Sequence, residues 1–177
     1  SYFHLLRFHA ANPKRRPMVV FTPKSMLRLK AAASSIGDFT SGTFLPVIGD
    51  ATVNNAARVI FCSGKIYHDL VAERNRLNDS STAIVRVERL YPFPVAQMEV
   101  EAKKHPNANL LWVQDEPANQ GAWPHVALST TESIGGTGVD ARVLRRISRR
   151  AAASPATGSH HLHEDEAKAL LDEAFTR

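Results

Sequence analysis

The stretch that decides the fold is Leu110-Leu-Trp-Val-Gln-Asp-Glu-Pro-Ala-Asn-Gln-Gly-Ala-Trp-Pro124. Its four leading apolar residues predict a strand buried on both faces, as strands of parallel sheets usually are. The chain then becomes polar, and Pro117 is expected to end the strand's hydrogen-bond ladder. A helix is expected to begin near Ala122. The stretch is therefore a strand-to-helix turn crowded with carboxylates and amides.

Two interpretations of this turn stay open on the residues alone. In the first, Asp115 and Glu116 are solvated and Asn119 is simply a helix cap. In the second, the cluster belongs to a catalytic site or an interface, because ligands bind at the carboxyl ends of strands in open α/β sheets. Paired carboxylates can act as acid and base, but they need a partner group and a pocket, and the sequence shows neither.

Outward from this turn, apolar runs alternate with helical patterns. The expected strands are Met18–Phe21, Arg58–Cys62, Thr82–Val87, Leu110–Val113 and Arg142–Ile147, and the expected helices are Ile66–Leu77, Val95–Lys104, a stretch from Ala122 and a closing helix from Ser159. This alternation predicts an α/β three-layer domain with a mostly parallel sheet of about five strands. The arginine-rich last strand is expected at the sheet edge, where charge blocks further pairing.

Two segments interrupt this pattern. Ser34–Asn55 shows no sustained periodicity and contains three glycines and a proline, which predicts a long loop. A loop of this length in a compact domain is usually functional or packed against a neighbour. Gly135–Gly138 predicts a flexible turn before the last strand.

Composition narrows the class of protein. A chain of 177 residues suits one α/β domain, and a net charge of +5 that is spread along the chain does not favour nucleic-acid binding. The single cysteine, Cys62, lies in an apolar run and is expected to be a buried structural thiol in a reducing compartment. No apolar run is long enough to span a bilayer, so we expect a cytoplasmic protein without a membrane segment. The absent initiator Met suggests a piece of a longer chain.

Other polar patterns give weak signals. Ser63-Gly-Lys65 between a strand and a helix suggests a phosphate loop, but Val59 and Ile66 stand where that motif needs Gly and Ser or Thr. His160, His161 and His163 lack further ligands, so solvated histidines are favoured over a metal site. Arg149 and Arg150 allow an anion site, although solvated charges at a sheet edge are favoured over it.

Seven segments taken together resemble a known family. They are Tyr2-Phe-His-Leu-Leu-Arg7, Phe21-Thr-Pro-Lys-Ser-Met-Leu-Arg28, Gly42-Thr-Phe-Leu-Pro-Val-Ile-Gly49, Cys62-Ser-Gly-Lys-Ile-Tyr67, Ile84-Val-Arg-Val-Glu-Arg-Leu-Tyr-Pro-Phe-Pro94, Trp112-Val-Gln-Asp-Glu-Pro-Ala-Asn-Gln-Gly-Ala-Trp123 and Ser154-Pro-Ala-Thr-Gly158. In this order they resemble the C-terminal region of the E1 component of 2-oxoglutarate dehydrogenase, in its actinobacterial-like form of dehydrogenase or decarboxylase.

This resemblance implies an enzyme of the tricarboxylic acid cycle. E1 of this family uses thiamine diphosphate and Mg²⁺ to decarboxylate 2-oxoglutarate and passes the succinyl group to the lipoyl arm of the E2 dihydrolipoyl succinyltransferase. The upstream domains bind both cofactors, so no catalytic, cofactor-binding or metal-binding residue is expected in this segment, which alone should be inactive. Residues 1–12 then form the tail helix of a pyrimidine-binding domain, and residues 13–177 form a transketolase C-terminal-like domain.

The resemblance also implies roles for particular residues. The strand end and the following helix start are expected to support the subunit contact of a homodimer, through Gln114, Glu116, Asn119, Gln120, Gly121 and Trp123. Possible effector contacts are Lys65, Arg89, Arg149 and Arg150. In the actinobacterial branch, basic residues of this domain bind acetyl-CoA as an activator, but our alignment places Phe8, Ala96 and Gln97 at those positions. We therefore expect weak or no activation by acetyl-CoA, because its phosphates lose charged partners.

Two alternatives to this function stay open. The segment can be a regulatory or assembly module that binds E2 or a nucleotide-like effector through Ser34–Asn55 and the arginines near Arg149. It can also belong to the E1 of another 2-oxo acid, because the residues that select the substrate are expected upstream.

Overall fold

The computed structural model describes residues 1–14, 16–134, 138–139 and 142–176. The chain divides into two compact units, Ser1–Pro46 and Val47–Arg177. Residues 135–137 of the glycine-rich turn expected before the last strand lie outside the described residues. Among the described helices, none combines the length and the apolar character that crossing a membrane requires.

The first unit consists of short helical pieces. They are α1 (Tyr2–Ala11), the 3₁₀ turns η1 (Lys24–Arg28) and η2 (Lys30–Ala32), and α2 (Gly37–Thr40). His4 Nε2 donates to the Asp38 carbonyl oxygen over 2.6 Å, and the Phe3 ring packs edge-on against Phe39 with centroids 5.1 Å apart. None of the described residues in this unit is buried.

The strand expected at Met18–Phe21 does not form. This segment has no regular secondary structure and pairs with no described strand, and Val19 and Phe21 are 78% and 92% exposed. The prediction was wrong because an apolar run alone does not supply a sheet partner. The edge of the sheet beside β3 is taken instead by two residues, β1 (Val47–Ile48), from within the long loop expected at Ser34–Asn55.

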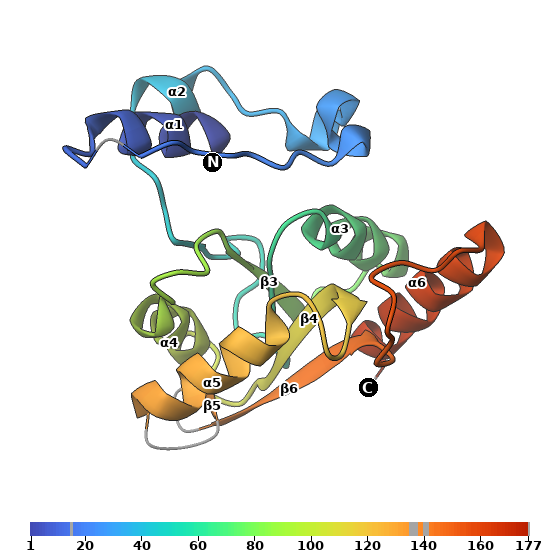
Figure 1. The fold of residues 1–177 in the computed structure, drawn as a ribbon. Coiled ribbons are helices and arrows are strands. Elements are labelled where there is room, and N and C mark those ends of the chain that lie inside the picture. The colour runs from blue at the N-terminus through green and yellow to red at the C-terminus, as the bar shows by residue number, and fades with distance from the viewer. Residues whose placement is uncertain (15, 135–137, 140–141, 177) are drawn as a thin grey trace. The chain divides into compact units, whose positions relative to one another are not determined.

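The second unit contains a six-stranded sheet in the order β1-β3-β2-β4-β6-β5 (Figure 1). Its four long strands are β2 (Arg58–Cys62), β3 (Thr82–Val87), β4 (Asn109–Pro117) and β6 (Arg142–Arg149). These four are parallel, and two-residue strands, β1 and β5 (Gly138–Val139), add antiparallel edges. The predicted mostly parallel α/β sheet is confirmed, and it is consistent with a transketolase C-terminal-like fold.

Four helices cover the sheet: α3 (Ile66–Leu77), α4 (Val95–Lys103), α5 (Trp123–Ile134) and α6 (His160–Phe175). Side chains alternate along the strands, so Val59 and Phe61 join one buried cluster while Ile60 and Cys62 join the other. The first cluster includes residues of α4 and α5, and the second includes residues of α3 and α6. The result is the three-layer arrangement expected from the alternation of strands and helices.

The winding of the sheet changes direction at β2. The chain leaves β2 through α3 to reach β3 on one side, then crosses through α4 to reach β4 on the other side of β2. In open α/β sheets, the carboxyl ends of the two strands at such a switch point flank the usual ligand crevice. Here those ends lead to Lys65, after β2, and to Asp115, within β4. The candidate site therefore lies at this edge.

Candidate functional site

Gln114 organises the end of β4. Its side-chain amide is buried, and its Oε1 accepts hydrogen bonds from Trp112 Nε1 over 3.1 Å and from the Trp123 backbone nitrogen over 2.8 Å. Its Nε2 donates to the Gln120 carbonyl over 2.7 Å and to the Pro117 carbonyl over 3.2 Å. One side chain therefore forms hydrogen bonds to Trp112 on the strand, to two carbonyl groups of the turn and to the first backbone nitrogen of α5. The last of these bonds is the one that a helix cap usually makes.

The strand is longer than the expected Leu110–Val113, but it ends at Pro117 as expected. Pro117 still pairs with Arg149, after an irregular register that begins at Val113. Proline is tolerated at such irregularities because the ladder is already disrupted there. The Ala118 nitrogen then donates to the Arg149 carbonyl over 2.9 Å.

Gly121 closes the turn in a conformation that favours glycine. Its φ angle is +66°, and a Cβ built there would lie 2.8 Å from Glu116 Cβ and 3.0 Å from Gln114 Nε2. A side chain at this position would therefore be strained twice, by backbone conformation and by contact. Glu116 itself is exposed.

Asn119 and Gln120 hold a different segment from the one expected. Asn119 Nδ2 and Gln120 Nε2 each donate to the Ala152 carbonyl over 2.9 Å, and Asn119 Oδ1 accepts from the Ala152 nitrogen over 3.0 Å. Asn119 therefore fixes the loop after β6 through two hydrogen bonds to the backbone of Ala152. Its interpretation as the cap of α5 was wrong, because α5 begins only at Trp123. The indole of Trp123, at the start of α5, lies 5.7 Å from the Arg146 guanidinium.

Asp115 lies at the centre of a row of charges. Its carboxylate is 4.0 Å from Lys65 Nζ and 3.9 Å from Arg149 Nε, and its carbonyl accepts a hydrogen bond from Arg149 Nε. Lys65 also donates to Asp69 over 2.7 Å, and Arg149 Nη1 reaches Glu166 at 3.5 Å. The row joins α3, β4, β6 and α6, so it stabilises the junction of four elements.

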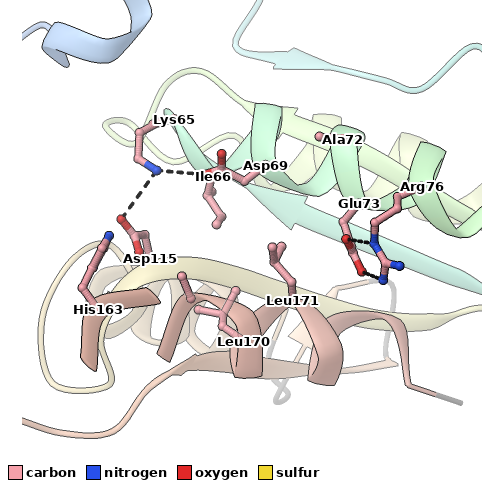
Figure 2. Close-up of a pocket in the computed structure, with 11 residues that line it drawn as sticks. Lys65, Ile66, Asp69, Ala72, Glu73, Arg76, Asp115, His163, Leu170 and Leu171 are labelled. Atoms are coloured by element: carbon pink, nitrogen blue, oxygen red, sulfur yellow. Dashed lines mark hydrogen bonds and ion pairs between the residues drawn. The ribbon is translucent and has the colours of Figure 1, made fainter. Parts of the chain in front are cut away.

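A cavity of about 390 Å³ lies between α3 and α6 beside this row (Figure 2). Its apolar wall comes from Ile66, Ala72, Ala167, Leu170 and Leu171, and its polar rim comes from Lys65, Asp69, Glu73, Arg76, Asp115 and His163. Figure 2 shows the Lys65–Asp69 contact at one end and the Glu73–Arg76 pair at the other. The volume is within the range of small-molecule pockets. Within the rim, Lys65 pairs with Asp69 and Arg76 pairs with Glu73, so these charges are compensated before any ligand binds.

The surroundings of Lys65 keep it charged. Burial lowers the pKa of this ammonium, but the Asp69 hydrogen bond and the nearby Asp115 and Glu116 carboxylates outweigh burial and raise the pKa above its ordinary value. The neighbouring His68 is affected in the opposite direction, because burial and the Arg86 guanidinium lower its pKa.

Two of the four predicted effector residues meet around Asp115, and the others do not. Lys65 and Arg149 lie on either side of it, whereas Arg150 is exposed beyond β6 and Arg89 donates to the Pro92 carbonyl over 3.1 Å in the loop before α4. Within the described ranges, no group of three His, Cys, Asp or Glu side chains is arranged to hold a metal ion.

Sequence reasoning missed several polar residues that the fold brings together. Asp69, Glu73 and Arg76 line the α3–α6 cavity, and their spacings to Lys65 and to each other, i,i+4 and i,i+3, already indicated pairs on one helix face. The buried ion pair between Asp50 and Arg74 gave no such signal, because a loop residue and a helix residue meet there through the fold.

The comparisons with known proteins now give the family. A family profile described as 2-oxoglutarate dehydrogenase C-terminal matches residues 33–175. The chain belongs to this family, which confirms the resemblance to the C-terminal region of E1.

Curated relatives agree over nearly the full length of the chain. It is 45% identical to a multifunctional 2-oxoglutarate metabolism enzyme of Mycobacterium sp. (strain JLS) over 185 residues, which cover 99% of this chain and 14% of the relative. It is also 45% identical to a 2-oxoglutarate dehydrogenase E1 component of Cupriavidus necator over 179 residues, 99% of this chain and 18% of the relative. The chain thus spans less than a fifth of these relatives.

Proposed function

We propose that this chain is the C-terminal part of a thiamine diphosphate- and Mg²⁺-dependent E1 enzyme that decarboxylates 2-oxoglutarate in the tricarboxylic acid cycle. In this proposal the enzyme is a cytoplasmic homodimer that passes its succinyl product to E2. The observation that carries the proposal is the 45% identity to a named E1 component over 99% of the chain. An identity of 45% over nearly the whole chain supports a shared fold with that E1 component.

The part proposed for this segment is architectural. At the carboxyl edge, Gln114 accepts a hydrogen bond from the Trp123 backbone nitrogen and Asp115 lies 4.0 Å from Lys65 Nζ, so both side chains contact the protein itself. No described group of His, Cys, Asp or Glu side chains is arranged to hold Mg²⁺. We therefore derive no step of the reaction through these residues. Residues 1–12 as the tail of a pyrimidine-binding domain, and residues 13–177 as the transketolase C-terminal-like domain, are part of the same proposal.

The first experiment measures thiamine diphosphate- and Mg²⁺-dependent decarboxylation of 2-oxoglutarate. The chain is assayed alone and after addition of the upstream polypeptide from the same source. We expect no turnover alone and turnover on recombination. Turnover by the 177 residues alone would contradict the proposed placement of the cofactor site, and a panel of 2-oxo acids in the recombined enzyme tests the alternative substrate.

The proposed subunit contact is tested by substitution at the turn after β4. Glu116→Ala and Gln120→Ala are expected to weaken dimerisation or turnover of the full-length enzyme, measured by sedimentation and by activity. Asp165→Ala is the matched control, because Asp165 is an exposed carboxylate on α6 that makes no ion pair with a described residue. If both turn variants match the control, the contact does not lie at this turn.

The second candidate function, an effector-binding module, is favoured by the cavity between α3 and α6. Saturable binding of AMP or acetyl-CoA by the native polypeptide, lost in Lys65→Met, would support it. Turnover that does not respond to these nucleotides would favour the architectural role alone.

A further inference from the structure

A second, smaller cavity lies under the loop that follows β6. Its volume is about 240 Å³, and it opens beyond the carboxyl ends of β4 and β6, where Pro117 and Arg149 line it. The loop residues Ser154 and Thr157 form its other side. The cavity is smaller than the pockets that take drug-sized ligands, so it suits a small ion or a small polar group.

Arg149 supplies a buried positive charge to this cavity. Its side chain is only 8% exposed, and a guanidinium keeps its proton under all ordinary conditions. Nε is used by the Asp115 carbonyl, and Nη1 reaches Glu166 Oε2 only at 3.5 Å, the outer limit of a hydrogen bond. Nη2 donates to no residue that the structure describes. The guanidinium therefore has hydrogen-bond donors left for a ligand.

The unpaired Nη2 of Arg149 is not sealed inside the protein. Among the described residues, the fully buried side-chain nitrogen or oxygen atom without a hydrogen-bond partner is Thr157 Oγ1, and its burial closes it off from the cavity. The guanidinium of Arg149 is therefore the polar group of this lining that has both spare donors and access to a ligand.

The charge balance of the lining sets the sign of the ligand. Arg149 and Arg150 contribute two positive charges and Glu166 contributes one negative charge. Arg150 is exposed and forms neither an ion pair nor a hydrogen bond with any described residue. The lining is therefore net positive by one charge, while the Asp115 carboxylate, 3.9 Å from Arg149 Nε, lies outside the lining. The free donors of Arg149 match the planar, two-point geometry with which arginine binds carboxylates and phosphates.

We propose that this cavity binds a small oxyanion, a phosphate or carboxylate group, which Arg149 holds through its Nη atoms. Arg150 closes over the anion from the solvent side. Nothing in this inference depends on the proposed role in E1, because it rests on the cavity alone.

Calorimetric titration of the native polypeptide with inorganic phosphate, at fixed ionic strength, tests the site. We expect one saturable site, weakened about tenfold in Arg150→Ala, as for the loss of one charge-assisted hydrogen bond. Arg149 is left intact because it also holds the Asp115 carbonyl. Arg145→Ala, an exposed arginine of the same strand, is the control and should bind as the wild type does.

Titrations with acetate and succinate distinguish the two sources of the oxyanion. Binding of phosphate alone assigns the site to a phosphate group, and binding of either carboxylate with the same ranking of variants assigns it to a carboxylate. Absence of saturable binding for all three probes would overturn the proposal. So would equal affinity in wild type and Arg150→Ala.

Discussion

The side-chain oxygen of Gln114 accepts a hydrogen bond from the backbone nitrogen of Trp123 over 2.8 Å, and so fastens the end of β4 to the first residue of α5. The same oxygen accepts from Trp112 Nε1 on the strand. Because the amide is buried, any replacement that cannot both donate and accept leaves several polar groups without partners.

Gln114→Leu is therefore expected to lower the free energy of unfolding by about 3 kcal/mol, since it strands two buried donors and two carbonyls. Urea unfolding followed by tryptophan fluorescence measures this change. Gln120→Leu is the control, because Gln120 is less buried and its side chain makes a single hydrogen bond, to Ala152. If Gln114→Leu lowers the free energy of unfolding no more than Gln120→Leu does, the hydrogen bonds of Gln114 contribute little to stability.

How far the sequence leads depends on whether a feature is local. Ile66–Leu77 was predicted to the residue, because an apolar stripe, a preceding turn and charges at helical spacing all lie within it. The strands β2, β3 and β4 were also predicted, because each is a short apolar run that can be recognised locally. Met18–Phe21 failed, because strand formation needs a partner that periodicity does not reveal. At the site, the sequence named the residues of the turn but not their hydrogen bonds, because the contact of Asn119 with Ala152 depends on where β6 ends.

Gly121→Ala tests the strain at the turn. A left-handed φ costs a residue with a Cβ about 1–2 kcal/mol, and the new methyl group would also press on Glu116. We expect a loss of about 2 kcal/mol in the free energy of unfolding. Gly158→Ala has open space around its Cβ and should stay within about 0.5 kcal/mol of wild type. Equal stability of the two variants would argue against a strained turn.

Asp50 gives the fold a dependence on pH. Burial would raise the pKa of this carboxyl, but hydrogen bonds from Thr52, the Ile84 nitrogen and Arg74 outweigh burial and lower the pKa. A carboxyl whose pKa is lower in the folded state stabilises it above the unfolded pKa, about 3.9, and this contribution is lost as pH falls below that value.

Asp50→Asn leaves Arg74 without its charged partner and is expected to cost about 3 kcal/mol at pH 7. The difference from wild type should be constant at neutral pH and should shrink as the pH falls below about 4. Urea unfolding at several pH values measures it. A difference that persists unchanged into acid would mean that the charge of Asp50 is not what stabilises the fold.

Cys62 is expected to be inert in the folded chain. The thiol is fully buried between β3 and the second cluster, and burial raises its pKa to about 12, so hardly any thiolate exists at neutral pH. Labelling with a disulfide reagent such as DTNB should be negligible under native conditions and complete in denaturant. Rapid native labelling would contradict the burial.

The absence of any buried residue among those described in Ser1–Pro46 has a thermodynamic consequence for the whole chain. Ordering each residue costs about 1–2 kcal/mol of backbone entropy, which is normally offset by removing apolar side chains from water. The described residues of this unit form no buried core that could take up apolar side chains, and Tyr2, Phe21 and Ile36 remain in contact with solvent. We therefore expect the helices of this unit to be stable only where another surface covers their apolar side chains. Val47–Arg177, in contrast, contains both buried clusters of the chain's described residues.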